Sequence, residues 1–338
     1  MDYVILVLPN HNRVYREQAP SLAIEELAAL NQYVFTGQLS DIRQEQVGGL
    51  DCIAFSGPEL EPWQLEYVRT LSFCFGCFQR EGELLRPIDL PGEDYFPDDL
   101  LTILKYSGKT NEAFTALLYN VTLWAGAFGD RFFERLRILD PVCGRGTTLY
   151  YALTRGHDAD GLELAKADVQ VIDQFLSRYL QEHRYKHQIQ RGRVTRPQGG
   201  TGRRITAQGA KSKEELKANP FSLNVINDDT VNVNNHFARG TYHALVADLP
   251  YGVQHGGSGT GRGHISAGAL LSRALPVWTK VLKKGGTVGV SWNVNATPRS
   301  AIVTELEAAG LELVPGLEGF EHRVDQAVRR DLAVARKR

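Results

Sequence analysis

The chain of 338 residues has no long hydrophobic run. Its apolar stretches fall short of the roughly 18 residues that a membrane span needs, so no membrane partner is expected. The amino terminus has one short apolar run, residues 3–8, without the basic leader of a signal peptide. The sequence therefore predicts a cytoplasmic protein.

An excess of charge is also missing. Lys and Arg total 38 and Asp and Glu total 39, which gives a formal net charge of −1. Whole-chain electrostatics therefore do not indicate a polyanionic partner, and a nucleic-acid site would have to show itself as a local concentration of charge.

Cysteines are few. Cys74 and Cys77 form a lone C-x-x-C pattern, and no second pair or histidines at ligand spacing lie nearby. Three flanking phenylalanines favour a strand rather than the turn of a redox site. We therefore expect no metal centre here. The four cysteines of the chain are Cys52, Cys74, Cys77 and Cys143.

The length and composition are typical of a soluble protein with two domains, or with one large domain and an appendage. Apolar periodicity in the first 90 residues predicts a β-α-β-α-β-β order. We interpret residues 1–95 as a small α/β domain, ending in the Pro- and Asp-rich stretch 91–99. The expected strands are 2–9, 52–55, 73–78 and 84–88, and the expected helices are 21–30, capped by Ser21, and 62–71.

A strand, a glycine turn and a helix follow from residue 137, with the sequence DPVCGRGTT at 140–148. Gly144 and Gly146 allow a ligand close to the backbone, and a helix amino terminus favours electronegative groups. A nicotinamide fingerprint would need a third glycine where Leu149 stands. Asp140 would repel a pyrophosphate but suits a cationic amino group. An amino acid joined to a nucleoside without phosphate describes S-adenosylmethionine.

Further carboxylates follow the next strands. Glu163 ends the strand 158–164 and lies 23 residues after Asp140, where a carboxylate would accept both ribose hydroxyls. The strand 221–226 is followed by Asp228 and Asp229. Either could accept from an adenine amino group, with Asp229 preferred.

The apolar run 244–247 predicts a buried strand that ends in the sequence DLPYG, residues 248–252. Asp248 can accept a hydrogen from an amino group, and the Leu249 carbonyl can accept a second beside Pro250, which cannot donate. Tyr251 can stack on a planar base. The alternative is an ordinary strand-end turn, because Asp, Pro and Gly are all turn residues.

A basic stretch covers residues 184–217, with ten Lys and Arg against two Glu. It is too long for a simple connection, so we expect an insertion that is flexible or only partly ordered. It is either a solvated loop or an arm that contacts phosphates.

Two glycine-containing loops resemble phosphate loops without matching them. The loop 105–112 precedes a helix and either presents amides to an anion or simply caps that helix. The loop 252–263, with His255, Arg262 and nearby His264, lacks the Lys-Ser/Thr ending. We expect it to be a mobile loop beside the active site.

Taken in order, these motifs resemble the class I S-adenosylmethionine-dependent methyltransferases. DPVCGRGT is similar to their first motif, and DLPYG to the amino-methyltransferase motif, usually [D/N]PPY, with Leu249 in place of a proline. The order of the motifs resembles that of the THUMP-associated tRNA guanosine 2-amino methyltransferases. It includes GKTNEAFTALLYN before these two motifs and RDLAVARK after them. The resemblance covers about residues 105–336. Members usually carry a longer amino-terminal RNA-binding region, so the resemblance implies that residues 1–95 are a candidate RNA-binding unit.

The resemblance implies a Rossmann-like methyltransferase domain over residues 96–338, with a seven-stranded, mostly parallel sheet and the basic insertion near 184–217. It implies S-adenosylmethionine as cofactor, RNA, most closely tRNA, as partner, and no metal. The catalytic residues implied are Asp248, Leu249, Pro250 and Tyr251. The cofactor-binding residues implied are Asp140, Pro141, Cys143, Gly144, Gly146, Thr147, Glu163, Asp228 and Asp229.

Two other functions stay open. The same motif serves DNA adenine and cytosine amino methyltransferases, and the basic insertion suits either polymer; the small amino-terminal domain favours RNA. A cofactor-binding scaffold without turnover is the third hypothesis, and the complete set of residues 248–251 argues against it.

Overall fold

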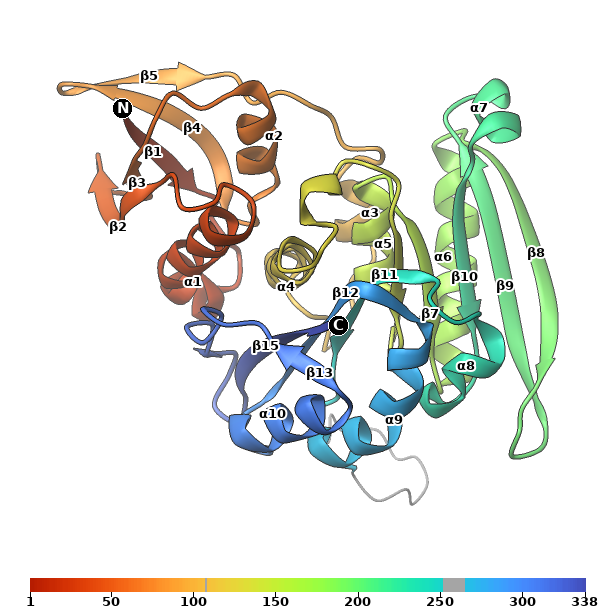
Figure 1. Ribbon diagram of the computed structural model, residues 1–338. Coiled ribbons are helices and arrows are strands. Elements are labelled where there is room, and N and C mark those ends of the chain that lie inside the picture. Colours follow the sequence, from red (N-terminus) through yellow and green to blue (C-terminus); the bar gives the residue numbers. More distant parts are fainter. Residues whose placement is uncertain (107, 252–264) are drawn as a thin grey trace.

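The computed structural model describes residues 1–106, 108–251 and 265–338, and within them the strands form two sheets, of five and ten strands. The smaller sheet comes from the beginning of the chain and lies to one side of the larger sheet, with α1 and α4 between them (Figure 1). No helix of the described residues is both long and apolar enough to cross a membrane.

The smaller sheet has the order β2-β3-β1-β4-β5, and all its neighbours are antiparallel. Its first six elements follow the β-α-β-β-α-β order of the ferredoxin-like motif, and β5 is added at the edge. Its elements are β1 (Asp2–Val7), α1 (Arg13–Tyr33), β2 (Ser40–Val47), β3 (Leu50–Ser56), α2 (Pro62–Thr70), β4 (Cys74–Glu81) and β5 (Leu84–Ile88).

Two predictions for this region were wrong. The predicted order lacked β2, an edge strand whose residues are mostly polar and exposed, so that apolar alternation does not reveal it. The predicted first helix began with Ser21 as its cap. In the structure α1 begins at Arg13, Asn12 caps it by accepting from the Tyr15 amide (3.1 Å), and Pro20 lies inside the helix.

The larger sheet has the order β13-β15-β12-β11-β6-β7-β10-β9-β8, and β14 also pairs with β15. Its strands are β6 (Arg137–Asp140), β7 (Asp158–Leu162), β8 (Lys186–Thr195), β9 (Thr201–Ala210), β10 (Phe221–Ile226), β11 (Tyr242–Asp248), β12 (Leu282–Asn293), β13 (Leu311–Leu313), β14 (His322–Arg323) and β15 (Arg329–Lys337). The helices of this part are α3 (Asp99–Thr102), α4 (Glu112–Trp124), α5 (Thr147–Thr154), α6 (Lys166–Glu182), α7 (Lys213–Ala218), α8 (Val233–His236), α9 (Ala267–Val281) and α10 (Arg299–Ala308), with the 3-10 turns η1 (Gly129–Arg131) and η2 (Thr230–Asn232).

Five central strands, β10, β7, β6, β11 and β12, are parallel, and antiparallel strands extend the sheet on both sides. The sheet is wider than the seven strands expected, because β8, β9 and β14 are added. The strand order reverses between β6 and β11, and ligands in open α/β sheets bind beyond the carboxyl ends of the strands at such a point. Asp140 ends β6 and Asp248 ends β11.

The basic stretch 184–217 is ordered, against the prediction of a flexible or partly ordered insertion. It forms the antiparallel hairpin β8–β9 and the short helix α7, and residues 204–209 of β9 pair with the whole of β10. Ile205 and Ala207 alternate along β9 and are buried. The Arg and Gly residues elsewhere in β9 conceal this period of two in the sequence.

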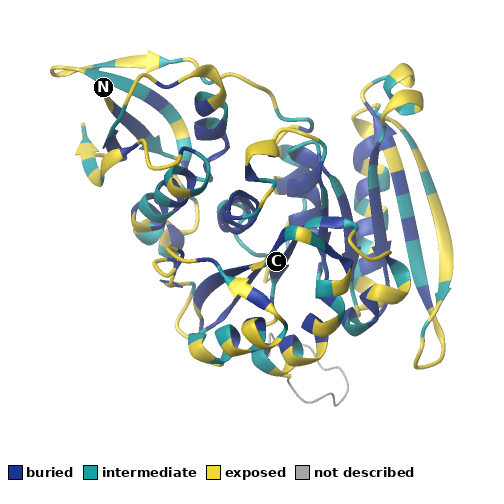
Figure 2. Ribbon diagram, in the orientation of Figure 1, coloured by how far each residue is buried: buried dark blue, intermediate teal, exposed yellow. Residues whose placement is uncertain are grey.

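The amino-terminal elements share an apolar core with the larger sheet. Buried side chains of α1, α2 and α4 belong to one continuous cluster (Figure 2). Within it, Glu26 of α1 is completely buried and accepts from Asn120 of α4 (2.9 Å) and from the Ser72 amide (3.0 Å). Burial raises the pKa of Glu26 to about 7. The division near residue 95 stays a prediction.

Candidate active site

Asp248 is held at the end of β11 by hydroxyl groups. Within the described residues, Thr110, Ser291 and Tyr251 all donate to its carboxylate; the Tyr251 bond is 2.6 Å. Ser291 lies opposite Asp248 in the neighbouring strand β12. Thr110 comes from the loop before α4. Three parts of the chain therefore fix the orientation of one carboxylate.

Tyr251 is packed against a buried cation. The guanidinium of Arg330, from β15, lies 4.9 Å from the centre of the Tyr251 ring and 4.3 Å from that of Phe114. Arg330 is only 3% exposed, and no described residue accepts from its Nε atom. Burial raises the pKa of Tyr251. Stacking of Tyr251 on a base stays a prediction, and Arg330 already occupies one side of the ring.

The predicted glycine turn lies between β6 and α5. Gly144 and Gly146 have φ angles of +51° and +89°, which favour glycine. The Gly146 amide donates to the Cys143 carbonyl (2.7 Å) and closes the turn. The sulfur of Cys143 fills the space above Gly161, where an added Cβ would come within 2.8 Å of it. Cys143 is thus buried and shapes the turn.

Asp140 is 3% exposed, and its carboxylate accepts from the Val142 amide (3.0 Å). Burial raises its pKa to about 7, against the opposing effects of the Val142 amide and the Thr148 hydroxyl; the nearby charges of Asp248 and Glu163 raise it further. This carboxylate therefore changes charge near neutral pH.

Glu163 follows β7 and supports the glycine turn. Its carboxylate accepts from the amides of Gly144 (2.9 Å) and Ala165 (2.6 Å). Burial raises its pKa, although these amides favour the charged form. Each carboxylate oxygen has two lone pairs, so acceptor sites remain for a diol.

The two aspartates after β10 differ in their surroundings. Asp228 is 1% exposed and accepts from the Asn232 amide group (3.0 Å) and the Asp229 backbone amide (2.8 Å), while its second oxygen lies 2.7 Å from a ring nitrogen of His236. Asp229 caps η2 through the Val231 amide (3.2 Å) and is half-buried. Asp229 is therefore the more accessible acceptor.

A cavity of about 310 Å³ opens at the point where the strand order reverses. This volume lies at the lower end of the range for small-molecule sites. Among the described residues, its lining brings together the first motif and the DLPY segment. The predicted residues in the lining are Asp140, Cys143, Gly144, Thr147, Asp248, Leu249, Pro250 and Tyr251. Pro141, Gly146, Glu163, Asp228 and Asp229 lie outside it.

Several residues of this site were not predicted. Tyr106 and Arg145 line the cavity on the side of the glycine turn, with the guanidinium 4.5 Å from the ring centre, and Arg145 also donates to Asp168 (2.7 Å). Thr110 sits in the loop 105–112, whose next residue, Asn111, caps α4 through the Ala113 amide (2.9 Å). That loop is both a helix cap and part of the site.

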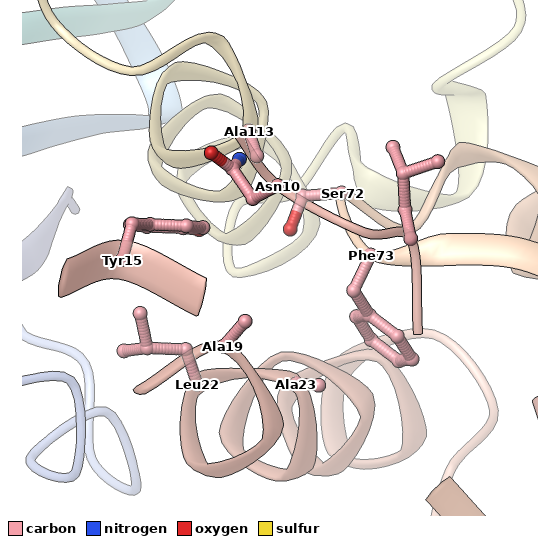
Figure 3. A pocket seen from close by; sticks show the side chains of 9 residues that line it. Asn10, Tyr15, Ala19, Leu22, Ala23, Ser72, Phe73 and Ala113 are labelled. Atoms are coloured by element: carbon pink, nitrogen blue, oxygen red, sulfur yellow. The ribbon is translucent and has the colours of Figure 1, made fainter. Parts of the chain in front are cut away.

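The amino-terminal unit contacts this loop directly. Asn10, between β1 and α1, exchanges two side-chain hydrogen bonds with Asn111, at 3.1 and 3.3 Å. Beside them is a cavity of about 10 Å³, at the lower limit for one water molecule (Figure 3). It is lined by Leu8, Asn10, Tyr15, Ala19, Leu22, Ala23, Ser72, Phe73 and Ala113. The contact is closely packed, and Asn111 is the residue next to Thr110, which donates to Asp248.

The expected mobile loop 252–263, with His255, Arg262 and His264, lies outside the described residues. In the part of the chain that the structure does describe, no group of three or more His, Cys, Asp or Glu side chains is arranged to hold a metal ion.

No protein-family model and no curated protein sequence matches the chain. Solved structures that match it include TrmN from Thermus thermophilus, with 13% identity, a TM-score of 0.39, and coverage of 88% of this chain and 59% of that one. TYW2 from P. horikoshii in complex with MeSAdo has 11% identity, a TM-score of 0.34, and coverage of 77% and 70%. A TehB-like SAM-dependent methyltransferase from Corynebacterium glutamicum has 14% identity, a TM-score of 0.35, and coverage of 61% and 82%. At these identities, function has to be inferred from the residues of this chain.

Proposed function

We propose that this protein transfers a methyl group from S-adenosylmethionine to the exocyclic amino group of a base in RNA, and that its target is the 2-amino group of guanosine in tRNA. One observation carries the proposal. Asp248, with Leu249 and Pro250 after it, lines the same cavity as the glycine turn headed by Asp140. An amino-group acceptor and a site suited to an amino acid nucleoside therefore face one space.

The residues fit the cofactor. Gly144 leaves the backbone open toward the cavity, since an added Cβ would meet no atom within 4 Å. Asp140 would hold the cationic amino group, and Glu163, behind the turn, would accept from the ribose hydroxyls. Asp229 would accept from the adenine amino group. When bound, the cofactor supplies a methyl group that is already activated on a sulfonium, so positioning provides most of the rate acceleration.

The chain's own part of the reaction centres on Asp248. Its carboxylate would accept one hydrogen of the base amino group, and the Leu249 carbonyl would accept the other, which leaves the nitrogen lone pair free. As the nitrogen gains the methyl group it loses a proton, and Asp248 is placed to take it. The base has to be unpaired or flipped, because its amino group otherwise lies in a base pair.

Transfer of a labelled methyl group to unmodified tRNA and to duplex DNA tests the proposal, with mass spectrometry of the nucleosides to identify the product. We expect label in tRNA as 2-methylamino guanosine. Asp248→Ala should abolish the transfer, while the exposed Asp130→Asn serves as a matched control and should leave it unchanged. Label only in DNA, or transfer by Asp248→Ala at the original rate, would contradict the proposal.

A further inference from the structure

The β8–β9 hairpin concentrates positive charge that the rest of the chain does not show. Residues 186–210 contain no Asp or Glu. The outer strand β8 forms the edge of the sheet and is largely exposed. The cationic residues of the hairpin are Lys186, Arg191, Arg193, Arg196, Arg203 and Arg204.

Arg193 and Arg203 lie directly opposite each other in the hairpin. Cross-strand neighbours point to the same face of a sheet, and like charges in such a pair destabilise it. Arg191 is paired with Asp173 of α6 (2.8 Å), and Arg196 lies 3.9 Å from Asp228. Among the described residues no carboxylate lies within ion-pair distance of Arg193 or Arg203. An external anion would remove this unfavourable arrangement.

The two arginines lie at the active-site edge of the sheet. β9 runs antiparallel to β10, and Arg204 is opposite Ile226, the last residue of β10. The tip of the hairpin therefore projects beyond the same edge that carries Asp140 and Asp248 (Figure 1). β8 and β9 are five and four strands away from β11. At roughly 4.8 Å per strand, they are about 20–24 Å from Asp248, too far to contact the target nucleotide itself.

The hairpin tip is held rigidly in this position. The Arg203 carbonyl accepts from the Asn227 amide (2.9 Å), and the Arg196 guanidinium donates to the Asn227 carbonyl (3.0 and 3.1 Å). Gln198 and Asn232 exchange side-chain hydrogen bonds at 3.0 and 3.3 Å. The backbone that carries Arg203 is therefore fixed next to the end of β10.

We infer that Arg193 and Arg203 bind backbone phosphates of the RNA substrate, away from the nucleotide that is methylated. The inference rests on the proposed function, because an RNA substrate supplies the phosphates. Guanidinium groups bind phosphate oxygens in a bidentate manner, and contacts of this kind position a nucleic acid without reading its sequence.

The test is the salt dependence of binding between the full chain and an unmodified tRNA transcript, measured by fluorescence anisotropy. For the double variant R193Q/R203Q, we expect weaker binding and a slope of log Kd against log salt reduced by about 2, one for each lost phosphate contact. The matched control is Lys186→Gln, which removes one charge at the opposite end of β8 and should leave the slope unchanged. An equal reduction per charge in the control would overturn the inference.

Arg193→Glu separates binding from stability. It places opposite charges across the strand pair, so the midpoint of thermal unfolding should stay the same or rise while tRNA affinity falls. An unchanged affinity would also overturn the inference, even if methyl transfer to tRNA is intact. If wild-type protein neither binds nor methylates RNA, the proposed function fails as well. Arginine-dependent binding to vesicles rich in phosphatidylserine, with no effect of R193Q/R203Q on tRNA affinity, would assign the pair to a membrane surface instead.

Discussion

The buried carboxylate of Asp140 predicts a narrow pH optimum for cofactor binding. It is 3% exposed, and burial raises its pKa from an ordinary 3.8 to about 7. If this carboxylate holds the cationic amino group of S-adenosylmethionine, only its ionised form binds well. Affinity should therefore rise as the pH increases through 7, and should fall again above about 8, where an α-amino group loses its charge.

The size of the effect follows from that pKa. At pH 6 about one Asp140 in eleven is ionised, and at pH 5 about one in a hundred. The apparent Kd should therefore rise about tenfold and about a hundredfold relative to the ionised protein. Asp140→Asn cannot ionise, so its weaker binding should be independent of pH over this interval.

The same shift predicts the stability of the protein without ligand. Because the pKa of Asp140 is raised in the folded state, the stabilisation from the neutral carboxyl is complete below pH 3.8 and is lost as the pH rises through 7. The loss amounts to about 4 kcal/mol at most, and Asp140→Asn should remove it.

Calorimetric titration with S-adenosylmethionine between pH 5 and 8.5, on both proteins, measures the first effect. Urea unfolding over the same range measures the second. Wild-type affinity that stays constant from pH 5 to 7, or an acidic limb with the same midpoint in Asp140→Asn, would refute the assignment of the cationic group to this carboxylate.

Three further predictions concern other carboxylates. Asp248→Asn should lower the rate constant of methyl transfer by about 10²- to 10⁴-fold with the cofactor Kd unchanged. A wild-type rate constant in single-turnover methylation would exclude a role as base. Glu163→Ala should weaken cofactor binding by about 1.5–3 kcal/mol, because it removes a charged acceptor; calorimetry that gives the wild-type Kd would reject this. Glu26 has its pKa raised by burial from 4.5 to about 7, so stability should fall by about 3 kcal/mol as the pH rises from 4.5 through 7. Glu26→Gln should abolish that dependence in urea unfolding, and an unchanged dependence would trace it to other groups.

The sequence located those site residues that lie at the end of a strand or directly after it. The strands β6 and β11 end in Asp140 and Asp248, and Glu163 directly follows β7; all three strands were located correctly. Their meeting at one sheet edge follows from the parallel arrangement, in which the carboxyl ends of the strands lie together. Periodicity and motif spacing therefore sufficed for the framework of the site.

The partners of those carboxylates could not be predicted in the same way. Thr110 and Ser291 are 138 and 43 residues away from Asp248, and a single Thr or Ser carries no pattern that distinguishes it from other polar residues. Arg330 begins the RDLAVARK stretch, but its position between two rings depends on packing among β15, α4 and the segment after β11. Such contacts become visible only in the folded structure.

The hydroxyl groups around Asp248 have a consequence for which bases can enter. Among the described residues, Tyr251, Thr110 and Ser291 donate to this carboxylate, which leaves one of its roughly four acceptor sites for a base. An amino group can fill that site, because it brings a hydrogen of its own. A carbonyl edge, such as that of uracil, would turn a lone pair toward the carboxylate and leave it short of one bond, at a cost of about 1–3 kcal/mol or more. Discrimination between an amino group and a carbonyl at this position would then be present before any base binds, as a property of the free protein.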